Sequence, residues 1–298
     1  MRRKLTRNEW IYMLMLLPGA VVMLLFKYIP MAGIAIAFQD FKITKGLFGS
    51  RFIGLKNFSN LLRLSAVNQA FINTVSIAAW NIALGLAIPI IFALLLNEVR
   101  RTGLKRGIQT IVYMPHFISW VVLAVTFKQL FSGSGIVNQL IAFLGAEKII
   151  FLSSNVWFRP VIIATAQWKE FGWATIIFIA AITSIDPNLY EAAMMDGATR
   201  FKRALHVTLP GMMPIIVLKA SLSLGQVLNA NFDQIFNMYN ELVYETGDVI
   251  QTYVYRLGLV QAQYGLSTAV SLLDATIGLT LIVTANKLAQ KFANYSIF

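Results

Sequence analysis

Long apolar stretches alternate with short polar segments along the whole chain. A membrane-spanning helix needs about 20 consecutive, mostly apolar residues. Segments that meet this need lie at about 10–32, 70–97, 108–131, 157–184, 209–236 and 265–288. The pattern predicts an all-α integral membrane protein with six transmembrane helices. We interpret residues 1–298 as one transmembrane domain, because no repeat, Gly/Ser-rich linker or low-complexity tract divides them.

The composition supports this class of protein. The chain is 57% hydrophobic and only 13% charged, whereas about a quarter of the residues in a soluble domain are charged. A net charge of +12 would suggest a nucleic-acid partner for a soluble protein. Here the basic residues lie mainly in short segments between apolar runs, so we expect contact with membrane lipid and not with nucleic acid. The absence of cysteine excludes disulfides and thiolate metal sites, and two distant histidines do not suggest a zinc site.

The basic residues also predict the orientation in the membrane. The two ends of the chain and the segments 98–107 and 185–207 together carry about twice as many Lys and Arg residues as the loops 39–67, 132–156 and 237–264. This asymmetry predicts that both termini are cytoplasmic. The loop 39–67 is an exception, since it is basic although it is expected on the outer side.

The first apolar run is expected to remain as a helix. It extends from Trp10 to about Pro30, which is longer than the apolar core of a signal peptide. Thr6 and Glu9 have the spacing of a capping box, which starts a helix directly after the basic end of the chain.

A polar stretch, YEAAMMDGATRFKRALHVTLPGMMP at 190–214, interrupts the apolar pattern. Asp186 and Pro187 before it predict the start of a short helix, as an N-cap followed by proline at the first helical position. Gly197 can end that helix in the left-handed conformation. The exposed side chains would be Tyr190, Glu191, Met194, Met195 and Asp196. An amphipathic loop at the membrane surface is the alternative interpretation.

A second short helix is predicted from Thr199 to His206, before Pro210 starts the fifth span. The expected product is a helix, a sharp glycine turn and another helix, which lie flat under the membrane. The orientation of the spans predicts that this segment, 185–207, is cytoplasmic.

The residue spacing in this segment closely resembles the EAA signature of ABC importer permeases. The matching positions are Glu191, Ala192, Ala193, Gly197, Val207, Leu209 and Pro210, with valine at 207 where isoleucine is usual. The resemblance implies that 185–207 is the coupling loop, which docks into a cleft on an ATPase subunit. It implies an ATPase-coupling role for Tyr190, Glu191, Ala192, Ala193, Met194, Asp196, Gly197, Leu209 and Pro210.

Further segments resemble the maltose-type carbohydrate-uptake class of these permeases, and above all its six-span Gram-positive branch, whose members serve oligosaccharides and polysaccharide fragments. They lie at 28–41, 54–58, 114–120, 184–200 and 248–259. The resemblance implies the type I ABC importer permease fold and a multi-pass protein of the bacterial plasma membrane. The implied partners are a second homologous permease, two ATPase subunits, an extracytoplasmic solute-binding protein and a carbohydrate substrate.

The chain holds no G-x-x-x-x-G-K-[ST] loop that could cradle ATP phosphates. We therefore expect a transport subunit that is not itself an enzyme and has no cofactor or metal of its own. ATP and magnesium would be bound by the partner ATPase subunits.

Polar residues inside the fifth span are candidates for the substrate path, because they are costly in a membrane. Gln226, Asn229 and Asp233 recur at i, i+3 and i+7, and so share one face of a continuous helix. The resemblance implies that this helix contacts sugar. Hydrogen bonding between helices is the alternative, and Asn231 lies off the shared face.

The third and fourth spans hold further candidates. The sequence QWKEFGW contains Trp168, Lys169, Glu170 and Trp173, which could stack on a sugar ring and orient its hydroxyls or a uronate. An aromatic belt with a Lys–Glu pair is the alternative. His116 and Trp120 are expected one turn apart in the third span, and for His116 we favour a packing role over the substrate path.

Small and polar residues form a stripe on the sixth span at Ser267, Ser271, Asp274 and Gly278. The stripe favours subunit packing over pore lining. Asp274 needs a partner or water inside the membrane, and Lys219 is the candidate partner.

These observations leave two other classes of protein to weigh. A secondary transporter could use Asp274 with Lys219 for ion coupling, but this leaves the EAA-like loop unexplained. A membrane-embedded enzyme would need a clustered acid, base or metal set, which the sequence does not offer. An ABC importer permease is the interpretation that accounts for the most residues.

Overall fold

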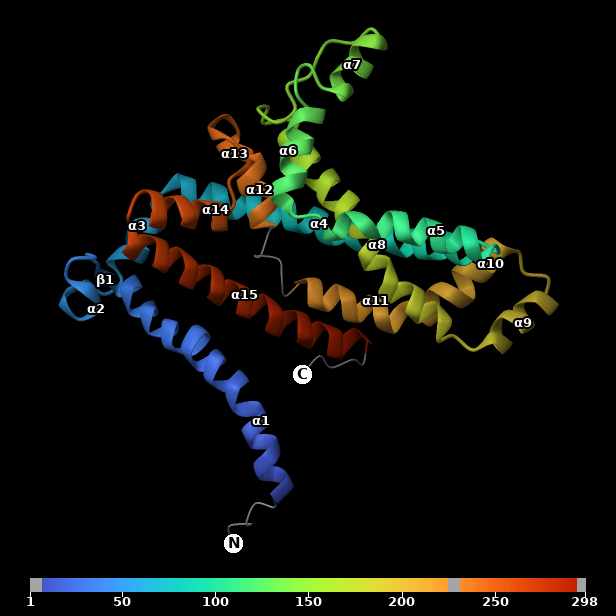
Figure 1. The fold of residues 1–298 in the computed structure, drawn as a ribbon, viewed down its shortest axis with the longest axis horizontal. Helices are drawn as coiled ribbons and strands as arrows, with labels where there is room; N and C mark the ends of the chain where they lie inside the picture. Colours follow the sequence, from blue (N-terminus) through green and yellow to red (C-terminus); the bar gives the residue numbers. More distant parts are fainter. Residues whose placement is uncertain (1–6, 225–230, 294–298) are drawn as a thin grey trace. The chain divides into compact units, whose positions relative to one another are not determined.

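The computed structural model describes residues 7–224 and 231–293, and these are largely helical (Figure 1). The helices and strands, with 3-10 and π turns labelled η, are α1 (Arg7–Met23), η1 (Leu24–Tyr28), η2 (Ile29–Phe38), β1 (Gln39–Asp40), α2 (Gly46–Gly49), β2 (Arg51–Phe52), α3 (Lys56–Leu61), α4 (Ser65–Asn97), α5 (Thr102–Tyr113), η3 (Met114–Phe117), α6 (Trp120–Leu130), α7 (Ile136–Phe143), α8 (Phe158–Thr183), α9 (Pro187–Met195), α10 (Arg200–Arg203), η4 (Ala204–Thr208), α11 (Leu209–Leu224), α12 (Phe232–Met238), η5 (Glu241–Val243), α13 (Tyr244–Gly247), α14 (Ile250–Tyr255), η6 (Arg256–Val260) and α15 (Tyr264–Ala293).

The membrane-spanning character of the chain is clear in its helices. Within the described residues, the helices that are long and apolar enough to cross a membrane are Trp10–Phe38, Ser65–Asn97, Arg200–Leu224 and Tyr264–Thr284. Two bent pairs raise the number of candidate spans to as many as 6: Thr102–Phe117 with Trp120–Leu130, and Phe158–Thr183 with Pro187–Met195. The upper number equals the six spans predicted from the apolar pattern.

The third span, predicted at about 108–131, is sharply bent next to Pro115. Its two halves meet at an angle of 101°. Pro115 lies in the 3-10 turn η3, Ile118 is extended, and the Ser119 hydroxyl then caps α6 by accepting from the Val122 amide at 3.4 Å. Proline cannot continue an α-helical hydrogen-bond ladder and the serine starts a new helix, so the chain turns here.

The fifth span also differs from the prediction of one helix over 209–236. It begins earlier, because α10, η4 and α11 follow one another without a break from Arg200 to Leu224. The π turn η4 directly precedes Pro210, whose ring and missing N–H would disturb a regular α-helix. A separate helix, α12, begins at Phe232 after the non-helical Asn231. Residues 209–236 therefore do not form one helical face.

The described chain divides into two compact units, and the candidate site lies in the unit that holds Ser65–Tyr253 and the residues from Asp274 on. Its long helices α4 and α8 pack along each other. Gly172 allows α5 to cross α8 closely, because a Cβ atom there would lie only 2.0 Å from the Val112 carbonyl oxygen. A hydrophobic cluster of this unit is built around Phe127, Phe151, Phe158, Ile162 and Met238.

A polar network ties α4 and α8 to the α13 segment in the same unit. The Arg159 guanidinium donates to Asn73 Oδ1 at 2.8 Å and to the Thr246 carbonyl at 3.3 Å. Asn73, which is fully buried, donates in turn to the Asp248 carbonyl at 2.9 Å. Buried polar groups paired in this way stabilise one arrangement of the helices.

The other unit holds residues up to Leu64 together with Val254–Leu273. Its hairpin pairs β1 with β2 in antiparallel register, with Gln39 opposite Phe52. Asn57 donates to the carbonyls of Ala37 and Gln39 at 2.8 and 3.1 Å, which fixes the hairpin on α3. At the start of the predicted sixth-span stripe, the Ser267 hydroxyl donates to the Val254 carbonyl at 3.0 Å.

Candidate functional site

The first candidate region is the turn between α9 and α10, within the predicted coupling loop. Asp186 caps α9 by accepting from the Asn188 amide at 2.9 Å, and Pro187 follows at the first position. Gly197 has a φ of 73°, and the Ala198 amide donates to the Ala193 carbonyl at 2.9 Å. This is the hydrogen-bond pattern of a left-handed helix end. The predicted start and glycine end of this helix are confirmed.

The exposed face of α9 is close to the one predicted. Glu191, Met194, Met195 and Asp196 are exposed, and Met195 reaches 89%. Tyr190 was expected to be exposed too, and this was wrong. Tyr190 is half-buried because its hydroxyl points back to η4 and donates to Thr208 Oγ1 at 3.0 Å.

The other residues predicted for coupling lie around this turn. Ala192 is exposed and Ala193 is half-buried on α9, while Leu209 and Pro210 begin α11. The predicted second helix, Thr199 to His206, does not stand alone, since it continues into α11. Thr199 is its N-cap and accepts from the Lys202 amide at 3.4 Å.

A groove of about 480 Å³ lies beside α9, and we call it the α9 groove. It is lined by Asn97, Ile182, Thr183, Ile185, Pro187, Tyr190, Glu191 and Met194. These residues come from the ends of α4 and α8, from Ile185 between α8 and α9, and from α9. Nearby, Arg200 and Glu98 form an exposed ion pair at 3.7 Å, which connects α10 to the end of α4.

The second candidate region is a cavity of about 340 Å³, which we call the polar cavity. It is lined by Ala78, Asn81, Ile82, Gly85, Pro89, Ala166, Gln167, Glu170, Phe171, Trp173, Ala174, Lys219, Ser223 and Asn231. These residues belong to α4, α8 and α11, with Asn231 just before α12. The volume lies at the small end of the range for small-molecule sites.

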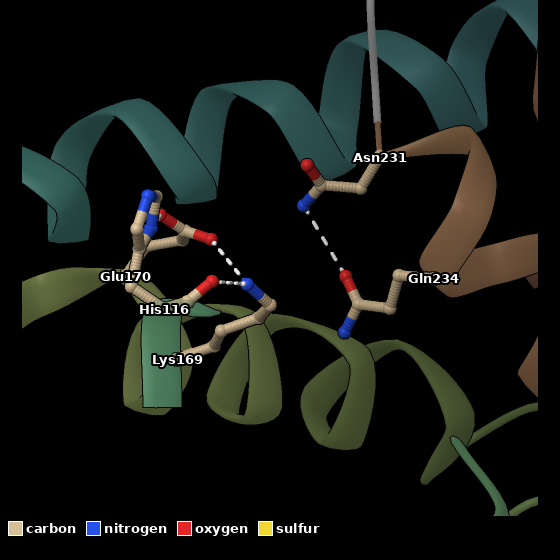
Figure 2. A network of polar contacts seen from close by, with 5 residues as sticks. All are labelled: His116, Lys169, Glu170, Asn231 and Gln234. Carbon is tan, nitrogen blue, oxygen red and sulfur yellow. Dashed lines mark hydrogen bonds and ion pairs between the residues drawn. The ribbon is translucent and has the colours of Figure 1, made fainter. Parts of the chain in front are cut away.

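His116 is held against α8 by Glu170, which Figure 2 shows, and by Trp173. Its Nδ1 atom lies 2.8 Å from Glu170 Oε2. Its ring stacks on Trp173 with a centroid distance of 4.5 Å and an interplanar angle of 1°. The side chain therefore holds the bent third span on α8. His116 and Trp120 were expected one turn apart in the third span. They do not share a helix, because the chain breaks between them.

Lys169 is buried behind this wall and its charge is paired. Figure 2 shows its ammonium group between Glu170 and the backbone of His116. Nζ donates to the His116 carbonyl at 2.6 Å and lies 3.2 Å from Glu170 Oε1. It also lies 5.6 Å from the centre of the Trp120 ring. Lys169 thus satisfies a carbonyl left free by the helix break and compensates the charge of Glu170.

Trp168 does not line the polar cavity. Its indole ring packs edge-on against Phe127 at 5.6 Å, and the side chain is partly exposed. Of the four candidates in QWKEFGW, Glu170 and Trp173 line the cavity, while Lys169 supports Glu170 from behind.

The candidates of the predicted fifth span separate into three groups. Gln226 and Asn229 lie outside the described residues. Asp233 is exposed on α12 and does not line the polar cavity. Asn231, which was the weaker candidate, does line it.

Gln234 positions Asn231 and was missed by the sequence analysis. Asn231 donates to Gln234 Oε1 at 3.2 Å (Figure 2). Gln234 itself is fully buried and donates to the Ile162 carbonyl at 2.7 Å and to Thr165 Oγ1 at 2.8 Å. The available signal was an amide directly before the apolar pair Ile235 and Phe236 in the sequence FDQIFNM.

Two amides of the cavity wall were also missed. Gln167 donates to Asn81 Oδ1 at 3.1 Å, which joins α8 to α4. Both residues interrupt apolar runs, but only the packing of two distant segments shows that they meet.

Lys219 and Asp274 do not form the expected pair. Among residues 7–224 and 231–293, no ion pair joins them. Asp274 Oδ1 is buried without a hydrogen-bond partner in this part of the chain. Lys219 lines the polar cavity instead.

Comparison with known proteins identifies the class to which this architecture belongs. Residues 85–292 match the family of binding-protein-dependent transport system inner membrane components. The match covers more than two thirds of the chain, so the chain belongs to this family of ABC transporter permeases.

Close sequence relatives extend over nearly the whole chain. The polygalacturonan/rhamnogalacturonan transport system permease protein YteP of Bacillus subtilis (strain 168) is 45% identical over 296 residues, which cover 99% of this chain and 92% of the relative. Protein LplB of the same organism is 42% identical over 295 residues, with the same coverage of 99% and 92%.

Solved structures share the fold. A chain in the crystal structure of a bacterial ABC transporter involved in the import of the acidic polysaccharide alginate is 36% identical, has a TM-score of 0.89 and covers 96% of this chain and 97% of its own length. A chain of the alginate ABC transporter in complex with an alginate pentasaccharide-bound periplasmic protein has a TM-score of 0.90 at 36% identity, with 98% of each chain covered.

These similarities confirm the resemblance stated from the EAA-like loop. The protein is a largely helical, multi-pass inner-membrane permease with the ABC importer fold, and it is a transport subunit rather than an enzyme. The secondary-transporter and membrane-enzyme interpretations are set aside by the family match.

Proposed function

We propose that this permease imports carbohydrates, as oligosaccharides or polysaccharide fragments. It would form half of the translocation path and pair with a second homologous permease. Two ATPase subunits would supply the energy, and an extracytoplasmic binding protein would deliver the sugar. The functions named for the relatives support the substrate class, since they include transport of polygalacturonan or rhamnogalacturonan and import of alginate.

The observation that carries this proposal is the projecting turn between α9 and α10. It combines a left-handed Gly197 with exposed Glu191, Met194 and Met195. A rigid turn that exposes large apolar side chains beside a carboxylate suits a protein interface. We assign this turn to the docking of an ATPase subunit on the cytoplasmic side.

Movement at the turn would reach the substrate path through α11. Tyr190 on α9 is bonded to Thr208 in η4, and the helix then runs without a break to Leu224. Lys219 and Ser223 on that helix line the polar cavity. Displacement of α9 by an ATPase subunit would therefore move one wall of the cavity.

The polar cavity is suited to hydroxyl-rich ligands. Asn81, Gln167 and Asn231 supply amide groups, and Trp173 supplies an aromatic surface on α8. Several amides around one aromatic group provide both orientation and contact area for a sugar. We infer that sugar passes along this cavity in the assembled transporter.

The proposal is tested with the transporter reconstituted from both permeases, the ATPases and the binding protein. Sugar-loaded binding protein should stimulate ATP hydrolysis, and Glu191→Lys should reduce the amount of ATPase that co-purifies, because it reverses the charge at the docking face. Glu147→Lys is the matched control, since Glu147 is exposed in the segment after α7. Normal ATPase association in Glu191→Lys would contradict the coupling role. ATP hydrolysis that no sugar-loaded binding protein stimulates would contradict carbohydrate import.

A further inference from the structure

The charged side chains that line the polar cavity do not neutralise each other. Its wall contains one carboxylate, Glu170, and one ammonium group, Lys219. These two charges would cancel if they faced only each other. They do not, because Glu170 is already paired within the structure.

Glu170 is compensated on both of its carboxylate oxygens. Oε1 lies 3.2 Å from Lys169 Nζ, and Oε2 lies 2.8 Å from His116 Nδ1. Lys169 is buried, with only 7% of its side chain exposed, whereas 45% of the Glu170 side chain is exposed. The Lys169–Glu170 pair therefore adds little net charge to the cavity.

Lys219 is the cation that remains. It is half-buried on α11, and its ammonium group makes no hydrogen bond or ion pair with another residue in the described part of the chain. An ionised side chain within a membrane span requires water, a partner or a ligand. The only carboxylate proposed for it from the sequence, Asp274, is not bonded to it.

We propose that Lys219 binds the carboxylate of an acidic sugar, such as a uronate, as it passes through the polar cavity. This inference rests on the proposed function and adds the chemical class of the carbohydrate. A carboxylate forms a charge-assisted hydrogen bond with an ammonium group, whereas the hydroxyls of a neutral sugar leave the positive charge uncompensated. One unpaired ammonium group matches the single negative charge of a carboxylate.

The neighbouring amides complete the recognition. Gln167 uses its N–H group to hold Asn81, so the Asn81 amide nitrogen remains as a donor toward the cavity side of α4. Asn231 is oriented by Gln234 from the other end of the wall. These groups can bind sugar hydroxyls while Lys219 selects for the acid.

The test uses the complete transporter in proteoliposomes, with trigalacturonate and its methyl ester as probes. The ester keeps the sugar ring and removes the negative charge. With the same binding protein in each assay, a change in the ratio of acid to ester uptake between permease variants reports on the permease itself. Lys219→Gln should lower this ratio about tenfold, the usual effect of losing one charge-assisted hydrogen bond, and Lys219→Arg should largely preserve it.

Two control variants define the role of Lys219. Lys148→Gln removes one positive charge from an exposed position outside the cavity and should leave the ratio unchanged. Asp274→Asn should also leave it unchanged, since Asp274 does not hold Lys219. A folding defect in Lys219→Gln is recognised because it would lower the ester-stimulated ATP hydrolysis as well.

The opposing outcomes are distinct. An unchanged ratio of acid to ester uptake in a Lys219→Gln transporter whose ester-stimulated ATP hydrolysis is normal, or an altered ratio in Asp274→Asn or Lys148→Gln, would overturn the carboxylate site while leaving carbohydrate import intact. Preference of the wild-type transporter for the ester would overturn it too. A wild-type transporter that takes up neither probe nor any neutral oligosaccharide would contradict the proposed function, and the carboxylate site with it.

Discussion

The Tyr190 hydroxyl donates a hydrogen bond to Thr208 Oγ1 at 3.0 Å, and so joins α9 to the turn from which α11 continues. This bond links the exposed turn directly to the helix that carries Lys219. A displacement of α9 would therefore reach α11 through this side-chain hydrogen bond as well as through the backbone around Gly197.

Removal of this bond should reduce the coupling of ATP hydrolysis to sugar import more than it reduces the association of the ATPase subunits with the permease. Tyr190→Phe keeps the ring and loses a hydrogen bond worth about 1 kcal/mol, a factor of about 5 in an equilibrium. We expect the number of sugars imported per ATP hydrolysed to fall by up to that factor, while the ATPases still co-purify. Tyr12→Phe, at an exposed position in α1, is the control. An unchanged ratio in Tyr190→Phe would show that the backbone alone transmits the motion.

A side chain at Gly197 should disturb the turn itself. Its φ of 73° is strained for other residues, at a cost of about 1 kcal/mol or more, and more for a β-branched one. Gly197→Val should therefore reduce both ATPase co-purification and sugar uptake at matched membrane expression. Gly103→Val is the control, because Gly103 has no left-handed conformation and a Cβ atom added there would meet nothing within 4 Å. Equal behaviour of the two variants would contradict a mechanical role for the turn.

The close crossing of α5 and α8 predicts a stability effect at Gly172. A Cβ atom there would lie 2.0 Å from the Val112 carbonyl oxygen, so Gly172→Ala must separate the two helices. Overpacking of this kind costs about 1–3 kcal/mol, and we expect a lower thermal unfolding temperature for the purified protein in detergent. Gly107→Ala, with open space around it, should raise or preserve that temperature. A stable Gly172→Ala protein would mean that the helices can shift apart at no cost.

The orientation of the chain can be measured directly because the native sequence contains no cysteine. Met195→Cys, at the exposed end of α9, should react with a membrane-impermeant maleimide only from the cytoplasmic side. Phe48→Cys should react only from outside, since Phe48 is 100% exposed in the loop 39–67. Labelling of the two positions from the same side of sealed vesicles would refute the predicted topology.

Local sequence signals predicted the elements that depend on local chemistry. The apolar runs predicted the six candidate spans, and Asp186, Pro187 and Gly197 predicted the limits of α9, because caps and left-handed glycines act over a few residues. The adjacent Lys169 and Glu170 were recognised as a possible pair for the same reason.

The features that were missed depend on contacts between distant segments. The break in the third span had a local signal in Pro115, although a proline alone does not give its angle of 101°. The role of Lys219 depends on Glu170 being occupied by Lys169 and His116, which lie on other elements. Tyr190 was assigned to the exposed face because its partner, Thr208, is 18 residues away.

Gly172 and the buried Lys169 together determine which part of the third span is held against α8. The Val112 carbonyl rests against the α8 backbone at Gly172. The His116 carbonyl accepts a hydrogen bond from Lys169, one turn earlier on α8, and the His116 ring stacks on Trp173, next to Gly172. The segment from α5 through His116 is therefore held on α8, and we expect the two to move together as one rigid unit. The break at Ile118 and Ser119 lies beyond these contacts, so α6 is fixed to α8 separately, through the packing of Phe127 against Trp168 and Ile162.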